Sequence, residues 1–211
     1  YASTGAVAPE NTHPFEQRGR LFAHNGVIGE IDRLETVLGS ARELVQGETD
    51  SERFFALISR EAEDTDDVGS AITRAAQWIA DNLPVFALNC VLITATELWA
   101  LRYPDVHELY VLQRPAGGPQ ASAHLDHRGR AGELHVHSAH LAQHPSVVVA
   151  SEPLDDDPGW RALESGQLLH VDADLQVSIA TVIARPPARV LTLADLDPRA
   201  AASQQATGGG R

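Results

Sequence analysis

The chain has 211 residues, of which 43% are hydrophobic and 21% are charged, the proportions of a folded domain with a sizeable core. Its 16 Lys plus Arg residues stand against 29 Asp plus Glu residues, for a formal net charge of -13. This excess of negative charge argues against non-specific binding to nucleic acid or to an anionic membrane. Cys90 is the single cysteine, which excludes an intramolecular disulfide and a multi-thiolate zinc site. A reducing, cytoplasmic location is therefore the default expectation.

No segment of the sequence predicts a membrane span or a secretory signal. The most apolar stretch, residues 85–95, is interrupted by Asn89 and is too short to cross a bilayer. The first nine residues lack both a basic segment and a long apolar segment, so they do not form a signal peptide. The chain begins at Tyr1 rather than at methionine, and we expect it to be cut within a strand.

The first half of the chain predicts helices. Apolar residues at helical spacing predict a first helix over residues 29–38. A second helix is expected to begin near Thr49, where short polar side chains can cap free N–H groups. A third is expected over residues 66–82. Ahead of them, the dipeptide Asn25-Gly26 is a strong turn signal because both residues tolerate positive φ.

The second half predicts strands, with a hairpin first and further strands punctuated by Gly, Pro and Asp. The expected strands are residues 86–94, 98–103, 108–112, 132–138, 146–151, 167–171 and 175–184. Helices followed by antiparallel strands indicate an α+β layered domain. We expect this domain to cover residues 1–184, and residues 185–211 to form a disordered tail because their composition is rich in Ala, Gln, Ser and Gly.

Three polar blocks near the start carry the candidate chemistry: residues 11–15 (Asn-Thr-His-Pro-Phe), 24–26 (His-Asn-Gly) and 47–52 (Gly-Glu-Thr-Asp-Ser-Glu). The Asn25 amide and the Gly26 backbone N–H are adjacent donors, a pair that can stabilise an oxyanion. A carboxylate in the first turn of a helix, such as Asp50, can accept hydrogen bonds from an ammonium group. Each block alone is equally compatible with a turn, a helix cap or a loop histidine.

Taken in order after residues 1–5 (Tyr-Ala-Ser-Thr-Gly), these blocks resemble the class II glutamine amidotransferases, in particular small stand-alone bacterial members. The resemblance covers residues 1–183. Residues 147–160 are similar to a closing strand and loop of such members, which include the γ-glutamyl amide hydrolase of ergothioneine biosynthesis. The resemblance implies an N-terminal-nucleophile (Ntn) hydrolase fold of four αββα layers with antiparallel sheets, here without its N-terminal strands.

The resemblance also implies roles for individual residues. Asn25, through its side chain, and Gly26, through its backbone N–H, match the oxyanion hole. Asp50 matches the carboxylate that binds the α-ammonium group of glutamine, and Ser3 and Thr4 match positions flanking its carboxylate. His13 matches a motif histidine near the pocket, in a structural rather than a catalytic role.

The reactive group implied by the resemblance is an N-terminal cysteine whose own α-amine acts as the base. Both this nucleophile and the arginine that binds the α-carboxylate are expected ahead of Tyr1, so the chain alone is expected to be inactive. Cys90 lies in a buried-strand pattern with no neighbour that would lower its pKa, so we expect an inert thiol there.

Other candidate sites are weaker. His135 and His137 share one face of a predicted strand, as two metal ligands could. A polar, exposed sheet edge explains them better than a metal site. Residues 155–157 (Asp-Asp-Asp) lack the ligand spacing of a calcium loop. We expect no metal and no cofactor.

The sequence therefore predicts an enzyme that cleaves the γ-amide of glutamine or of a γ-glutamyl compound through a cysteinyl thioester. Two alternatives stay open: a γ-glutamyl amide hydrolase of the ergothioneine-biosynthesis type, and a non-catalytic relative that binds a ligand. The expected partners are the small-molecule substrate and, where ammonia is passed on, a separate synthase subunit.

Overall fold

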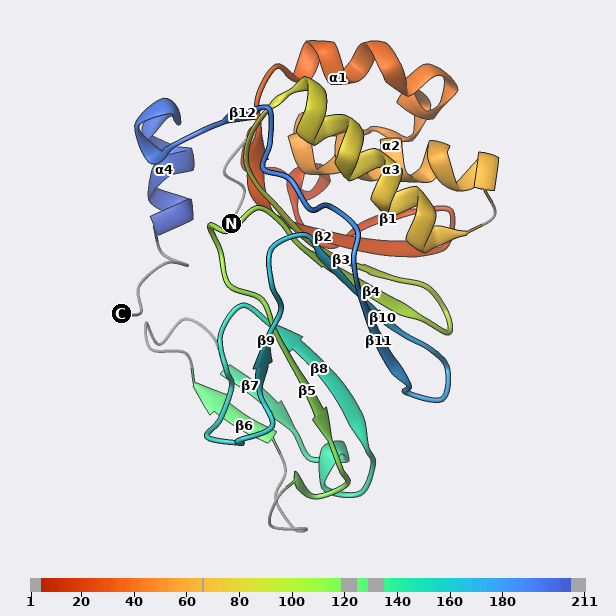
Figure 1. Ribbon diagram of the computed structural model, residues 1–211, viewed down its shortest axis with the longest axis vertical. Coiled ribbons are helices and arrows are strands. Elements are labelled where there is room, and N and C mark those ends of the chain that lie inside the picture. Colours follow the sequence, from red (N-terminus) through yellow and green to blue (C-terminus); the bar gives the residue numbers. More distant parts are fainter. Residues whose placement is uncertain (1–4, 66, 119–124, 129–134, 206–211) are drawn as a thin grey trace. The chain divides into compact units, whose positions relative to one another are not determined.

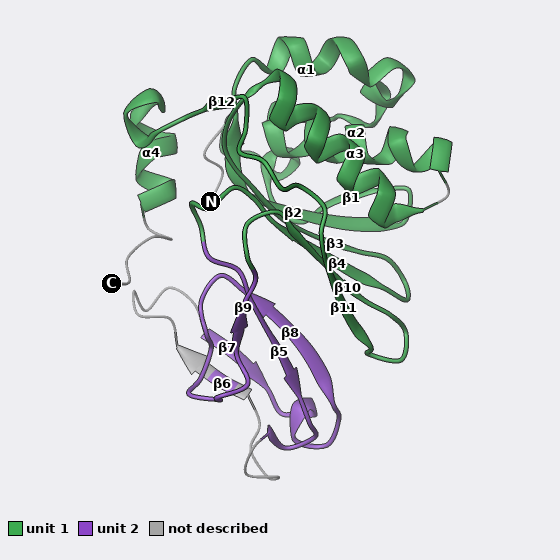
Figure 2. Cartoon of the chain, viewed as in Figure 1, with its two compact units in different colours: residues 1–107, 164–211 green, residues 108–163 purple. Residues whose placement is uncertain are grey.

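Two compact units make up the chain (Figure 2): unit 1 consists of residues 1–107 and 164–211, and unit 2 of residues 108–163. The computed structural model describes residues 5–65, 67–118, 125–128 and 135–205. Each unit has its own sheet. The candidate residues that the structure describes, His13, Asn25, Gly26 and Asp50, all belong to unit 1.

Unit 1 is built on a seven-stranded sheet. Its strands are β1 (Phe15–Gln17), β2 (Arg20–Ile28), β3 (Pro84–Ile93), β4 (Leu98–Arg102), β10 (Gln167–Val171), β11 (Val177–Thr181) and β12 (Arg189–Val190). The first six lie in that order and pair antiparallel, whereas β12 pairs in parallel with β3. The expected hairpin between residues 86–94 and 98–103 is confirmed by the pairing of β3 with β4.

Three helices pack on one face of this sheet (Figure 1): α1 (Ile31–Leu38), α2 (Asp50–Thr65) and α3 (Val68–Asn82). Their apolar sides form the main core with alternate residues of the strands, including Phe22, Ile28, Phe54, Phe55 and Leu88. All three helices begin within three residues of the positions that the sequence predicts. Side-chain caps mark two of these starts: Thr49 accepts the Glu52 N–H at α2, and Asp67 accepts two N–H groups of the first turn of α3.

Unit 2 contains the three-stranded sheet β8-β5-β9 and a separate β6–β7 pair. These strands are β5 (Tyr110–Arg114), β6 (Leu125–Arg128), β7 (His135–Ser138), β8 (Ser146–Ala150) and β9 (Arg161–Ala162). Its buried apolar residues include Val111, Leu112 and Leu163. Antiparallel sheets together with the helices of unit 1 confirm the expected α+β class.

Residues 185–205 differ from the disordered tail that the composition predicts. They include β12, the 3-10 helix Leu193–Asp195 and α4 (Pro198–Gln205). Ala200 is buried against Val27 and Phe86, and the Gln204 side chain is hydrogen-bonded to His107 at 2.7 Å. A few well-placed contacts thus order a segment whose polar, alanine-rich composition has no helical apolar pattern. Residues 206–211 lie outside the described residues.

Candidate functional site

The central candidate residues lie within β2, not in a turn. Asn25 pairs with Asn89 and Gly26 with Leu88 in the register between β2 and β3. The turn predicted from Asn25-Gly26 is therefore wrong: pairing along the whole strand overrides the local preference of the dipeptide. Because side chains alternate along a strand, His24 and Asn25 lie on opposite faces of the sheet. The His24 face is the one covered by the helices, since Phe22 and Ile28 share it and belong to the main core.

The backbone N–H of Gly26 points away from β3. Leu88, its register partner, donates its own N–H to the Tyr103 carbonyl at 2.6 Å, on the side of β3 away from β2. In an antiparallel ladder, residues opposite each other either exchange both hydrogen bonds or make none. Gly26 and Leu88 thus form a non-hydrogen-bonded pair, which directs the Gly26 N–H to the outer edge of β2.

Two further N–H groups share this edge, because the direction repeats every second residue. The His24 N–H donates to Nε2 of His13 at 3.3 Å. The Ile28 N–H donates to Oδ2 of Asp50 at 2.8 Å. The Gly26 N–H lies between them. The pairing of β1 with β2 ends at Phe22, so no strand among the described residues pairs with Gly26 on this side.

Close packing explains why residue 26 is a glycine. A Cβ atom added there would lie 1.8 Å from the Ala87 carbonyl oxygen and 2.8 Å from Nε2 of His24. The register between β2 and β3 shifts after Val27, and such a bulge redirects local backbone groups. The Ala87 carbonyl is hydrogen-bonded to the His24 ring at 3.1 Å, a contact that any larger residue at position 26 would block.

His24 is buried and neutral. Burial lowers the pKa of its imidazole, and the nearby Asp50 carboxylate opposes this only in part. A carbonyl oxygen can only accept, so Nε2 carries the proton and donates to Ala87. Nδ1 then accepts from the Ser51 hydroxyl, which lies 2.9 Å away.

His13 is half-buried at the same edge of β2. Burial lowers the pKa of its imidazole to about 4, and the neighbouring His24 adds to the decrease. Its Nε2 is unprotonated, because that atom accepts the His24 N–H. Its ring meets the Phe15 ring edge-on, with centroids 4.9 Å apart. His13 therefore lies next to the candidate donors.

Asp50 is the first residue of α2 and is only 1% exposed. Thr49 caps the helix, because its hydroxyl oxygen accepts the Glu52 N–H at 3.2 Å. The helix N-terminus carries a partial positive charge, so a buried carboxylate is tolerated there. Its bond to Ile28 places the Asp50 carboxylate two residues along β2 from Gly26.

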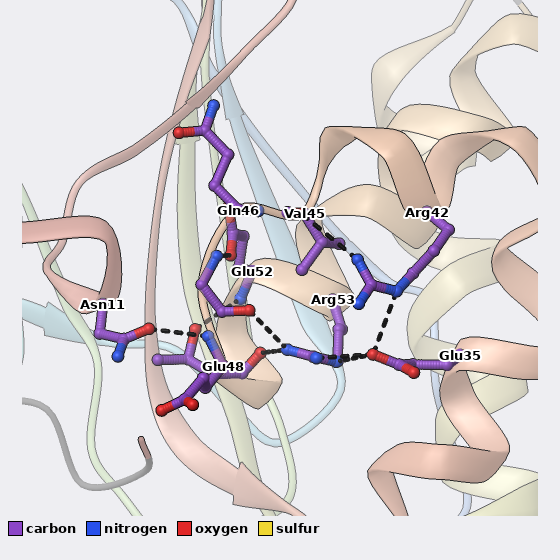
Figure 3. Close-up of polar contacts among 10 residues, drawn as sticks. Asn11, Glu35, Arg42, Val45, Gln46, Glu48, Glu52 and Arg53 are labelled. Carbon is purple, nitrogen blue, oxygen red and sulfur yellow. Dashed lines mark hydrogen bonds and ion pairs between the residues drawn. The ribbon is translucent and has the colours of Figure 1, made fainter. Parts of the chain in front are cut away.

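The loop before α2, residues 45–49, is held by buried side chains (Figure 3) and is called the Gly47 loop below. The two oxygens of Glu52 accept the N–H groups of Gln46 at 2.8 Å and of Gly47 at 2.7 Å. Glu52 is 5% exposed. The spacing from Thr49 to Glu52 is that of a capping box, in which the carboxylate would accept the N–H of Thr49. Here the Glu52 carboxylate instead accepts the N–H groups of Gln46 and Gly47, which precede Thr49 in the sequence.

Arg53 and Asn11 complete the support of the Gly47 loop (Figure 3). The Arg53 guanidinium donates to the carbonyls of Gly47 and Thr49 at 3.3 and 3.0 Å. It also pairs with Glu35, with a shortest distance of 2.6 Å. Oδ1 of Asn11 accepts the Glu48 N–H at 2.8 Å. The sequence blocks contain Asn11 and Glu52, but their contacts depend on the fold, and Arg53 lies outside the blocks.

The structure brings His13, Gly26 and Asp50 to one edge of β2. Asn25 precedes Gly26, and its side chain is half-buried on the sheet face opposite His24. Within the part of the chain that the structure describes, its amide forms no side-chain hydrogen bond. Ser3 and Thr4, which are predicted to flank the substrate carboxylate, lie outside the described residues.

Cys90 is 3% exposed. Burial raises the pKa of its thiol to about 12, so the reactive thiolate is absent at neutral pH. This agrees with the inert thiol expected from the sequence.

Metal-ligating side chains do not gather in the described ranges, where no group of three or more His, Cys, Asp or Glu is arranged to hold an ion. His135 is hydrogen-bonded to Asp126 at 2.7 Å. Asp155 accepts the Trp160 indole N–H at 2.7 Å, as in a solvated turn. Searched over the same ranges, no helix has both the length and the apolar character of a membrane span.

The family described as "Glutamine amidotransferases class-II" matches residues 1–191. Among curated protein sequences, none matches the chain.

Three solved structures are similar in fold. A class II glutamine aminotransferase domain protein from Silicibacter pomeroyi is 23% identical with a TM-score of 0.56, over 86% of this chain and 74% of that one. A predicted glutamine amidotransferase from Pseudomonas aeruginosa is 20% identical with a TM-score of 0.58, over 81% and 66%. The glutamine phosphoribosylpyrophosphate amidotransferase of B. subtilis is 19% identical with a TM-score of 0.55, over 86% and 34%. These likenesses show a shared fold and confirm the expected Ntn-hydrolase-like class.

Proposed function

The chain belongs to the class II glutamine amidotransferases, and from that premise we propose that it cleaves the γ-amide of glutamine or of a γ-glutamyl compound. One observation carries the proposal. On the outer edge of β2, His13 and Asp50 accept the N–H groups of His24 and Ile28, whereas the Gly26 N–H between them has no strand partner among the described residues. A donor directed outward beside a buried carboxylate suits a substrate with both an amide and an ammonium group.

Each residue then has a chemical role in the proposed reaction. The thiol of an N-terminal cysteine ahead of Tyr1 adds to the amide carbon, and the α-amine of that cysteine accepts the thiol proton. The Asn25 amide and the Gly26 N–H stabilise the oxyanion. The proton returns to the leaving nitrogen, ammonia departs, and water hydrolyses the thioester to glutamate and free thiol.

Asp50 and the residues around residue 3 would hold the amino-acid end of the substrate. The Asp50 carboxylate binds the α-ammonium group through a charge-assisted hydrogen bond. Ser3 and Thr4 flank the α-carboxylate. A separate synthase subunit that takes up the ammonia is the class of partner this reaction would serve.

The test is steady-state release of glutamate, measured with the protein that carries the N-terminal cysteine. Glutamine turnover is expected, and Asn25→Ala is expected to lower kcat by about two to three orders of magnitude with little change in KM. Asn82→Ala is the control, since Asn82 caps the far end of α3 through the Trp78 carbonyl. Turnover of γ-glutamyl amides but not of glutamine would favour the ergothioneine-type hydrolase, and turnover of neither would leave a non-catalytic relative.

A further inference from the structure

The His24 side chain joins β3 to the first turn of α2. Nε2 donates to the Ala87 carbonyl at 3.1 Å, and Nδ1 accepts from the Ser51 hydroxyl at 2.9 Å. The three residues are far apart in sequence, yet each ring nitrogen has one partner. The ring is thereby fixed in position and in tautomer.

Aromatic packing holds the His24 ring as well. The Phe54 ring meets it edge-on with centroids 5.6 Å apart, and the Phe22 ring stacks at 6.5 Å. Phe54 belongs to α2, as Ser51 does. The ring therefore has little freedom to turn away from Ser51.

Two contacts tie the first turn of α2 to β2, one on each side of Gly26. Ser51 is bound to the side chain of His24, and Asp50 is bound to the backbone of Ile28. A single contact would let the helix end pivot about it. Two contacts that flank Gly26 fix the distance from its N–H to the Asp50 carboxylate.

We propose that His24 is a positioning residue, which through Ser51 holds the ammonium-binding carboxylate of Asp50 at a set distance from the oxyanion donor of Gly26. His24 touches no substrate in this account. The inference rests on the proposed function, because it assumes that Asp50 and Gly26 bind opposite ends of one substrate. Binding energy from the ammonium end can then be used at the amide only while the two groups keep their spacing.

Ser51→Ala tests the link, because it removes the hydroxyl and leaves His24, Ala87 and Asp50 unchanged. We expect kcat for glutamine to fall about ten-fold while KM changes less than about two-fold. Ser59→Ala is the matched control. Ser59 lies in the same helix, is fully buried and donates to Gln17 in β1 at 3.0 Å. The Ser59→Ala variant therefore loses an equivalent hydrogen bond while the one between Ser51 and His24 stays intact.

A substrate that lacks the α-ammonium group separates positioning from damage to the oxyanion hole. Glutaramate, the des-amino analogue of glutamine, has nothing for Asp50 to hold. Ser51→Ala is therefore expected to turn over glutaramate at the wild-type rate, at enzyme concentrations where wild-type turnover is measurable.

The outcomes separate this inference from the proposed function. A fall with glutamine alone, absent in Ser59→Ala, supports it. Wild-type kinetics in Ser51→Ala, an equal loss in Ser59→Ala, or an equal loss with both substrates would each overturn it while leaving glutamine hydrolysis intact. A wild-type protein that cleaves no amide would instead contradict the proposed function.

Discussion

Oδ2 of Asp50 accepts the backbone N–H of Ile28 at 2.8 Å, which joins the first residue of α2 to the strand that carries Asn25 and Gly26. The carboxylate is 1% exposed and lies at the positive end of the helix. In the proposed reaction this carboxylate binds the ammonium group of the substrate through a charge-assisted hydrogen bond.

Replacing this charge tests the assignment. Asp50→Asn keeps an oxygen that can accept the Ile28 N–H but loses the negative charge. We expect KM for glutamine to rise about ten- to hundred-fold, the value of a charge-assisted hydrogen bond. Asp67→Asn is the control, because Asp67 also lies at a helix start and accepts two backbone N–H groups. Similar KM values in both variants would remove Asp50 from the binding site.

Gly26→Ala tests the close approach of the two strands. The added Cβ would lie 1.8 Å from the Ala87 carbonyl, so the strands must separate. We expect the free energy of unfolding to fall by about 2–3 kcal/mol, measured by urea denaturation. Gly19→Ala is the comparison, since a Cβ there has no atom within 4 Å and meets only the strain of a φ of +72°. Equal losses in the two variants would show that packing at Gly26 has no special importance.

Glu52→Gln tests the support of the Gly47 loop. An amide has one accepting oxygen, so one of the N–H groups of Gln46 and Gly47 loses its partner. We expect a loss of about 1–3 kcal/mol in the free energy of unfolding and faster hydrogen exchange at the Gly47 amide. Glu43→Gln, at an exposed position, is expected to change stability by less than about 0.5 kcal/mol. Unchanged exchange at Gly47 would contradict the proposed support.

Three histidines whose pKa is lowered by burial make the free energy of unfolding depend on pH. The pKa of His13 is about 4 in the folded chain against 6.5 for the free side chain, and burial shifts His24 and His107 in the same direction. Between these values the unfolded chain binds protons that the folded chain does not. As far as these histidines determine it, the free energy of unfolding is therefore highest above about pH 6.5 and falls as the pH decreases towards 4.

Urea denaturation at pH 7.5, 6 and 5 measures this fall. His13→Gln, which keeps an acceptor for the His24 N–H but does not titrate, is expected to show a smaller decrease than wild type. The remaining decrease belongs to His24 and His107. An identical decrease in both proteins would show that His13 titrates normally in the folded state.

Features that depend on residues close together in the sequence could be predicted from it. The start of α2 at Asp50 follows from the Thr49 cap, and the burial of Cys90 follows from the apolar residues around it. The turn predicted from the local preference of Asn25-Gly26 was wrong, because pairing with β3 places both residues within a strand.

The contacts that define the site join residues distant in sequence. The His13–His24 bond requires β1 and β2 to pair, so that residues 11 positions apart meet. The hydrogen bond from the Ile28 N–H to Asp50 requires α2 to pack on the sheet. No spacing rule predicts such contacts. The proposal of Asn25, Gly26 and Asp50 as site residues comes from the family resemblance, and it stays a prediction.

The central claim is that this site directs an N-terminal cysteine against a glutamine amide. Intact-mass spectrometry after treatment with an electrophilic glutamine analogue tests it most directly, in the protein that carries that cysteine. We expect one adduct, mapped to the N-terminal cysteine, whose formation is prevented by excess glutamine and slowed by Asp50→Asn. Cys90, whose buried thiol has a pKa of about 12, is expected to stay unmodified. An adduct on Cys90, or labelling that glutamine does not prevent, would contradict the account.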